Sequence, residues 1–150
     1  MKRRMFLAAF AAALLGAAPP TRAQPLNRDA TLYKNPQCQC CEGHAKYLRD
    51  HGYKVKVVAT HDLDQIKKEN GVPEALGGCH TILVGGYVVE GHVPVNTIER
   101  LLRERPPILG VSLPGMPQGA PGMTGRKREP FKIYELSKEP GGKPKVYATE

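Results

Sequence analysis

Residues 31–52 read TLYKNPQCQCCEGHAKYLRDHG and place three cysteines between a predicted strand and a predicted helix. Thr31-Leu32-Tyr33 forms a short strand, which Asn35-Pro36 ends. The helix runs from Glu42 to His51, and Gly52 stops it. The cysteines therefore occupy a strand-to-helix junction, and this junction guides the interpretation of the rest of the chain.

Short strands and helices alternate downstream of this junction. Val55–Val58 is a second strand, which must run parallel to the first because a whole helix connects them. Gly85-Gly86 supplies the positive φ angles of a two-residue hairpin turn. The other predicted elements are helices at Asp62–Asn70 and Pro94–Arg105 and strands at Thr81–Val84 and Tyr87–Val89. The order β-α-β-α-β-β-α is that of a thioredoxin or glutaredoxin core, so we predict an α/β, thioredoxin-like fold.

The chain from residue 106 onward adds two features to this core. Residues 106–128 form a loop rich in Pro, Gly and Met, and its length requires an explanation by function or by disorder. Residues 129–150 form an added C-terminal β-hairpin, with strands at Phe131–Leu136 and Lys145–Thr149 around Pro140-Gly141-Gly142. We therefore expect a single domain over residues 24–150.

The first 23 residues have the pattern of a cleavable signal peptide. The basic stretch Lys2-Arg3-Arg4 precedes an apolar run from Met5 to Ala18, and Thr21-Arg22-Ala23 is a small-x-small cleavage site. The run is shorter than the roughly 20 residues that span a bilayer, which disfavours a membrane anchor. The paired arginines also resemble a twin-arginine export signal, and both export routes stay open. We expect a periplasmic protein without a membrane anchor after cleavage.

The net charge argues against a nucleic-acid partner. The formal net charge is +8 at pH 7. Loss of the basic residues of the signal peptide lowers it to about +4. The remaining basic residues are interleaved with Asp and Glu, and the sequence has no basic-aromatic pattern for stacking on bases. We therefore expect no nucleic-acid binding.

Cys38, Cys40 and Cys41 place three thiols within four residues, where a helix start favours thiolates. Thiolates bind soft metals. Two structural disulfides are the ordinary alternative for four cysteines in an exported protein, but Cys40 and Cys41 are adjacent and Cys38 with Cys40 poorly matches disulfide geometry. A Cys38/Cys41 redox pair with CxxC spacing stays a rival, although the extra Cys40 serves coordination better than exchange.

Cys79 and His80 directly precede the third core strand. In glutaredoxin-like folds this turn faces the helix-start motif, so we expect Cys79 to join the other cysteines. A structural bridge from Cys79 to one of them is a further alternative. His80 stands where thioredoxins normally have a cis-proline that aligns a substrate peptide, so peptide docking should be impaired. This substitution again favours a metal site.

Met116 and Met123 lie in the long loop and not on a helical face. Methionine ordinarily fills gaps in a core, which is one interpretation of both residues. Thioethers also choose Cu(I) over zinc. A Pro/Gly loop with two methionines therefore fits a lid over a copper site.

The histidines divide less clearly. His92 follows the hairpin and can line the same end of the sheet as the cysteines. His44 lies one turn after Cys40 and Cys41. It can reach the cysteines, and an exposed position on the protein surface is an equal alternative. His51 and His61 stand among charged residues at the ends of elements, so we interpret both as exposed.

Several motifs together resemble a known family. They are Tyr33-Lys34-Asn35-Pro36-x-Cys38-x-Cys40-Cys41, Cys79-His80-Thr81, Val84-Gly85-Gly86-Tyr87-Val88-Val89-Glu90-Gly91-His92-Val93-Pro94, Pro114-Gly115-Met116-Pro117 and Pro121-Gly122-Met123. On these motifs the chain resembles the periplasmic copper-resistance thioredoxin-like family of CopG type, formerly a domain of unknown function. The resemblance covers nearly all of residues 24–150. It implies copper binding by the cysteine cluster, with copper redox chemistry proposed.

The resemblance also implies a set of metal ligands in this chain. Thiolates come from Cys38, Cys40, Cys41 and Cys79, thioethers from Met116 and Met123, and further ligand positions are His80 and His92. The expected cofactor is copper, as Cu(I) and in a cycle with Cu(II). Zinc is the competing metal because four thiolates also suit a tetrahedral zinc site.

We therefore expect a periplasmic copper-binding protein for copper resistance or homeostasis. Copper ions and other periplasmic copper-handling proteins are the expected partners. Metal binding comes first, and a copper oxidoreductase activity is compatible with it. The alternative is a thiol-disulfide oxidoreductase that uses Cys38 and Cys41.

Overall fold

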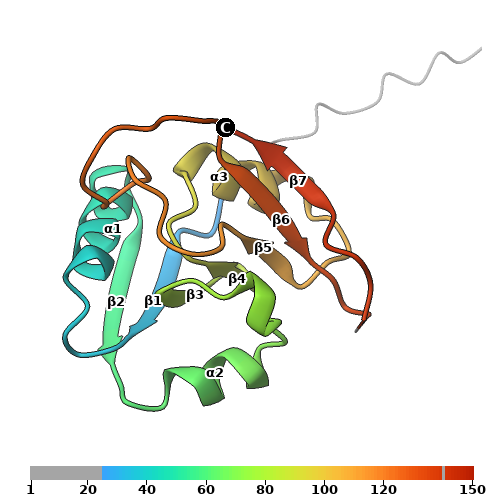
Figure 1. Ribbon diagram of the computed structural model, residues 1–150, viewed down its shortest axis with the longest axis horizontal. Coiled ribbons are helices and arrows are strands. Elements are labelled where there is room, and N and C mark those ends of the chain that lie inside the picture. The colour runs from blue at the N-terminus through green and yellow to red at the C-terminus, as the bar shows by residue number, and fades with distance from the viewer. Residues whose placement is uncertain (1–24, 140) are drawn as a thin grey trace, which may run out of the picture.

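The computed structural model describes residues 25–139 and 141–150, and its strands form one mixed sheet in the order β2-β1-β3-β4-β5-β6-β7 (Figure 1). β1 pairs in parallel with β2 and β4 in parallel with β5, while the other neighbours are antiparallel. The elements in chain order are β1 (Asp29–Lys34), α1 (Gln39–Asp50), β2 (Lys54–Ala59), α2 (Leu63–Glu69), the 3-10 helix η1 (Glu74–Leu76), β3 (His80–Val84), β4 (Tyr87–Glu90), α3 (Val95–Glu104), β5 (Gly110–Ser112), β6 (Lys132–Leu136) and β7 (Val146–Thr149).

Two sequence predictions concern residues outside this description. The predicted signal peptide, residues 1–23, lies there, as does Pro140 in the expected hairpin turn. Within the described residues, no helix has the length and apolar character needed to cross a membrane.

The segment from β1 to α3 has the expected order of strands and helices. Gly85 and Gly86 adopt φ angles of 56° and 85°, as the predicted hairpin turn requires. The expected start of α1 at Glu42 is wrong, since the helix begins at Gln39. The N–H of Cys38 donates to the carbonyl of Asn35 at 3.0 Å, and this closed turn leads directly into the helix. The second and third cysteines of the motif therefore lie in the first helical turn.

β5 lies inside the segment 106–128, so the prediction that this segment is a loop throughout is wrong. Three residues are too few for a strand to show a recognisable alternation of apolar and polar positions. Gly110 passes so close to the carbonyl of Val88 that a Cβ atom would collide with it. The strands of the predicted C-terminal hairpin are confirmed as β6 and β7, and β5 makes them a continuation of the core sheet.

The two faces of the sheet carry different clusters of buried side chains. The main core joins residues of α1 and α3 to Ile82 and Val84 of β3. Leu83, between them in the strand, belongs to the second cluster, which includes Leu76 of η1. Successive side chains of a strand point to opposite faces, so η1 packs on the face opposite to α1 and α3. The start of α1 is thereby fixed against the larger core.

The loop 113–128, orange in Figure 1, lies against both cysteine-bearing segments. The N–H of Gly115 donates to the carbonyl of Gly77 at 3.1 Å, two residues before Cys79. Farther along, Gly122 packs on the backbone of Gly43 in α1. A Cβ added to Gly43 would lie 2.7 Å from the carbonyl oxygen of Gly122. The loop is therefore packed against the folded protein beside both cysteine-bearing segments.

We predict that Gly43→Ala destabilises the protein although alanine is the better helix former. Alanine favours a helix interior by about 1 kcal/mol over glycine. Here its methyl group would collide with the backbone of Gly122, and such overpacking costs about 1–3 kcal/mol. Urea unfolding of the reduced, metal-free protein should show a net loss of stability.

Gly142→Ala is the matched control, since a Cβ at Gly142 meets no atom within 4 Å. Its stability should stay within about 0.5 kcal/mol of the unchanged protein. Equal or higher stability of Gly43→Ala would contradict the close packing of the loop on α1.

Candidate metal centre

The pairing of β1 with β3 brings the two cysteine-bearing segments together. The two strands are antiparallel, and Lys34 at the end of β1 pairs with His80 at the start of β3. The turn that follows β1 leads to Cys38 at the N-terminal cap of α1. Cys79 directly precedes β3. Both segments therefore meet at one end of the sheet.

The four predicted cysteine ligands lie together at this end. Cys38 and Cys41 are joined by a disulfide, while Cys40 and Cys79 are free thiols. The sulfur of Cys79 lies 3.7 Å from that of Cys40 and 3.6 Å from that of Cys41. The sulfur of Cys40 lies 3.5 Å from that of Cys38. All four sulfurs are within 4.8 Å of one another, and we call them the sulfur cluster.

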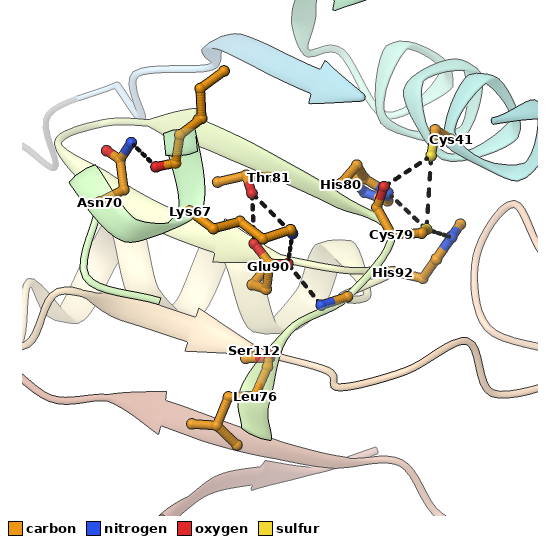
Figure 2. A network of polar contacts seen from close by, with 12 residues as sticks. Cys41, Lys67, Asn70, Leu76, Cys79, His80, Thr81, Glu90, His92 and Ser112 are labelled. Atoms are coloured by element: carbon orange, nitrogen blue, oxygen red, sulfur yellow. Dashed lines mark hydrogen bonds and ion pairs between the residues drawn. The ribbon is translucent and has the colours of Figure 1, made fainter. Parts of the chain in front are cut away.

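Two buried histidines contact Cys79 on its other side (Figure 2). Nε2 of His92 lies 3.0 Å from the Cys79 sulfur, and Nδ1 of His80 lies 3.3 Å from it. The other ring nitrogen of His92 donates to the carbonyl of Pro121 in the loop 113–128 at 2.6 Å. Cys79, His80 and His92 form a second group within 4.8 Å, which we call the histidine cluster.

His44 is fully buried, although the sequence left it open between the cluster and the surface. Its Nδ1 lies 2.7 Å from Nε2 of His80, and its Nε2 donates to the carbonyl of Val93 at 3.0 Å. The predicted exposure of His51 and His61 is confirmed. His44 therefore belongs to the site as a neighbour of His80.

Burial favours the uncharged forms of the three histidines and of Cys79. Burial, and then the nearby imidazole of His92, lower the pKa of His44 to about 3. Burial also lowers the pKa values of His80 and His92. Burial, and then the neighbouring Cys40, raise the pKa of the Cys79 thiol to about 12. A cation bound at Cys79 would therefore displace the thiol proton.

The turn between β1 and α1 is held by a buried lysine that the sequence analysis did not select. Lys34 is only 3% exposed, and its ammonium donates to the carbonyls of Asn35, Pro36 and Cys38 at 3.2, 3.1 and 3.2 Å. It also pairs with Glu42 at 3.2 Å. The position of Lys34 on the same face of β1 as the buried Leu32 was the available signal.

A buried carboxylate bonds to the residues on both sides of Cys79 and His80 (Figure 2). Glu90 is fully buried and forms an ion pair with Lys67 of α2. Its oxygens also accept the N–H of Gly78 at 2.6 Å and the hydroxyl of Thr81 at 2.7 Å. Glu90 stood in a quoted motif, but nothing in its spacing indicated this role. The network fixes the turn that carries Cys79.

The two predicted thioether ligands lie in different environments. Met123 is half-buried and packs against the main core, as Cys38, Cys40 and Cys79 do. Met116 is 59% exposed. The structure therefore brings Met123, and not Met116, into the packed part of the molecule.

The chemistry of the donor atoms fits a soft metal ion. The sulfur cluster offers four sulfurs once its disulfide is reduced, and the histidine cluster offers one sulfur and two imidazole nitrogens. Neither cluster includes a carboxylate. Thiolate and imidazole ligands suit copper and zinc, whereas magnesium and calcium require oxygen ligands.

Comparisons with known proteins find one family model and solved structures of a copper resistance protein. Residues 76–123 match a family model described as "Protein of unknown function, DUF411". The chain is similar to the solved structure "Copper resistance protein copG- Form 2", with a TM-score of 0.74 and 35% identity over 85% of this chain and 99% of that chain. For "Copper resistance protein copG- Form 1" the TM-score is 0.74 and the identity 34%, over 83% and 98% of the two chains. No curated protein sequence matches.

We predict that Lys67→Met strongly destabilises the protein. The change leaves Glu90 fully buried without its ion-pair partner. Loss of one member of a buried pair costs about 3–5 kcal/mol. Urea unfolding of the reduced, metal-free protein measures this cost. Lys68→Met, at the exposed next position in α2, is the control and should change stability by less than about 0.5 kcal/mol. Similar stabilities of the two variants would contradict the role of the pair.

We also predict a loss of stability in mild acid. The pKa of His44 is about 3 in the folded protein, and the pKa of a histidine in an unfolded chain is about 6.5. Below about pH 6.5 the unfolded chain therefore takes up a proton that the folded state does not. The free energy of unfolding falls as the pH drops from about 6.5 toward the pKa of His44 in the folded protein, about 3. The titration of His44 alone should lower the free energy of unfolding by about 2 kcal/mol between about pH 8 and about pH 5.

Urea unfolding at these two pH values checks the acid prediction. The variant His44→Asn lacks the titrating ring, so its loss of stability between them should be smaller by about 2 kcal/mol. An equal loss in both proteins would show that His44 is not a buried neutral group.

Proposed function

The chain belongs to the family of the copper resistance protein CopG, and from this premise we propose that it is a periplasmic protein that binds Cu(I) for copper resistance or homeostasis. The main support is the meeting of four cysteine sulfurs within 4.8 Å at one end of the sheet. Thiolates are soft ligands that suit Cu(I), and zinc shares this preference. We also propose the thioredoxin-like classification, which the element order from β1 to α3 supports.

The proposed thiolate ligands are those of the sulfur cluster, and His80 and His92 provide the imidazole ligands. Met123 supports copper over zinc because it carries a thioether and packs against the main core, as three of the four cysteines do. Met116 is exposed, so it must turn inward to serve as the second thioether. Zinc remains the metal against which copper must be tested.

We propose that the Cys38–Cys41 pair is the electron source when copper is reduced. When these thiols form their disulfide, they release two electrons and two protons, and two Cu(II) ions each accept one electron to become Cu(I). The disulfide removes two sulfurs from the sulfur cluster, but no member of the histidine cluster. The oxidised protein thus keeps an imidazole-rich site, while the reduced protein adds a sulfur-rich one that suits Cu(I).

A thiol-disulfide oxidoreductase is the second candidate function. The Cys38–Cys41 disulfide has CxxC spacing, and the free Cys79 thiol lies 3.6 Å from the Cys41 sulfur. This geometry supports thiol-disulfide exchange. The raised pKa of Cys79 opposes it, because the thiolate is the attacking species.

The proposed location and partners follow from the expected export signal. We propose that residues 1–23 direct export, by the general or the twin-arginine route, and are removed. Residues 24–150 then act in the periplasm without a membrane anchor. Other copper-handling proteins of that compartment are the proposed donors and acceptors of copper, and no nucleic-acid role is proposed.

We predict that the fully reduced, purified protein binds Cu(I) tightly and that Cys40→Ser weakens this binding. Loss of an outer hydrogen-bond partner lowers metal affinity about 10–100-fold. Loss of a direct thiolate ligand should lower the Cu(I) affinity at least as much. Competition with a coloured Cu(I) chelator, with zinc titrated in parallel, measures the affinities. The control is Gln39→Ser, at the exposed position next to Cys40, which should bind as the unchanged protein does.

Unaltered Cu(I) affinity in Cys40→Ser would contradict the shared sulfur cluster. The same preparations, freed of metal, should not reduce insulin above the background of the added reductant. Insulin reduction that survives chelation but is lost in Cys41→Ser would favour the oxidoreductase.

A further inference from the structure

The contact between His44 and Val93 determines which nitrogen of His44 carries hydrogen. The carbonyl oxygen of Val93 can only accept, and it lies 3.0 Å from Nε2 of His44. Nε2 therefore carries the hydrogen. The ring is fully buried, with two other imidazole rings centred 4.9 and 5.1 Å away, so it has a single N–H. Nδ1 of His44 is left as an acceptor.

This acceptor in turn determines the tautomer of His80. Nδ1 of His44 lies 2.7 Å from Nε2 of His80, so Nε2 of His80 must donate the hydrogen of this bond. His80 is also fully buried, which disfavours its charged form. Its second nitrogen, Nδ1, is consequently unprotonated and faces the sulfur of Cys79 at 3.3 Å.

The opposite tautomers would break the same chain of contacts. If Nδ1 of His80 carried the hydrogen, Nε2 of His80 would have to accept from Nδ1 of His44. The lone pair of His44 Nε2 would then face the lone pairs of the Val93 carbonyl. A buried donor or acceptor without a partner is unfavourable, so the Val93 carbonyl selects the first arrangement.

His92 reaches the same sulfur through a separate anchor. Its Nδ1 donates to the carbonyl of Pro121, so its Nε2 is unprotonated and lies 3.0 Å from the sulfur of Cys79. Two unprotonated imidazole nitrogens thus face one thiol, which has one hydrogen to donate. The excess of acceptors at this point matches a cation better than a hydrogen-bonded core.

We propose that His44 is a positioning residue that holds His80 in the Nε2–H tautomer, so that Nδ1 of His80 stays available to a metal ion beside Cys79. The proposal rests on the proposed copper function for its consequence, while the tautomer itself is a property of the metal-free chain. Hydrogen bonds to the far nitrogen of a ligating histidine orient the ring in this way at other metal sites. Here the chain of bonds starts at the turn that also carries His92.

Nitrogen-15 NMR of the reduced, metal-free protein tests the tautomer directly. Long-range proton-nitrogen spectra at neutral pH distinguish a protonated from an unprotonated ring nitrogen in each histidine. We expect the Nδ1 signal of His80 to be that of an unprotonated nitrogen and its Nε2 signal that of an N–H. A protonated Nδ1 in His80 of the unchanged protein would overturn the proposal.

Two substitutions separate positioning from packing. His44→Leu removes the acceptor and should shift His80 toward the Nδ1–H tautomer, whereas His44→Asn keeps an amide oxygen near the position of Nδ1 and should retain the original tautomer. His61→Leu, which removes an exposed histidine, is the control and should leave His80 unchanged. A folded His44→Leu variant with the original tautomer would overturn the proposal. If His44→Leu does not fold, the unchanged protein and His44→Asn still decide the question.

Cu(I) competition links the tautomer to metal binding. His44→Leu should bind Cu(I) about 10–100-fold more weakly than the unchanged protein, and His44→Asn should recover most of this loss. Equal affinities of His44→Leu and the unchanged protein would overturn the proposed consequence. Failure of the unchanged protein to bind Cu(I), with His80 in the expected tautomer, would overturn the copper function and leave the tautomer assignment intact.

Discussion

The candidate site depends on the antiparallel pairing of β1 with β3, in which Lys34 lies opposite His80. This register places the turn after β1 beside the turn before β3, although Cys40 and Cys79 are 39 residues apart in the sequence. A shift of one residue would reverse the face of every side chain in β3, so Ile82 would leave the main core and His80 would turn away from His44. The burial of Leu32, Ile82 and Val84 stabilises this register. The hydrophobic core thus sets the distance between the cysteines.

Burial and charge oppose each other at this site, and burial prevails. Lys67 acts to lower the pKa of the Cys79 thiol, yet burial raises it to about 12. Burial therefore favours the thiol form of Cys79, whereas a metal ion would need the thiolate, and the positive charge of a bound ion would have to supply what the lysine does not. The two lysines near the site form other contacts: Lys34 donates to carbonyls of the turn before α1, and Lys67 pairs with the side chain of Glu90.

The sequence sufficed for the elements from β1 to α3 because they have ordinary lengths and strong turn signals, such as Gly85-Gly86. It also sufficed to expect Cys79 beside the other cysteines, because in glutaredoxin-like folds the turn before the third core strand faces the start of the first helix. β5 could not be predicted, because it has three residues and its pairing depends on strands distant in the sequence. The burial of His44 depends on β3 and on the turn at Val93, so its place on α1 left both outcomes open.

Cys79 belongs to both donor clusters, which explains why its surroundings are the most constrained part of the site. An error in the position of its sulfur would disturb the sulfur cluster and the histidine cluster together. Glu90 restrains the residues on each side of it, through the N–H of Gly78 and the hydroxyl of Thr81. A buried ion pair adds little net stability compared with an apolar pair of the same shape, but its hydrogen bonds have defined directions. The Glu90–Lys67 pair is therefore better explained by the position that it gives to Cys79 than by the stability of the fold.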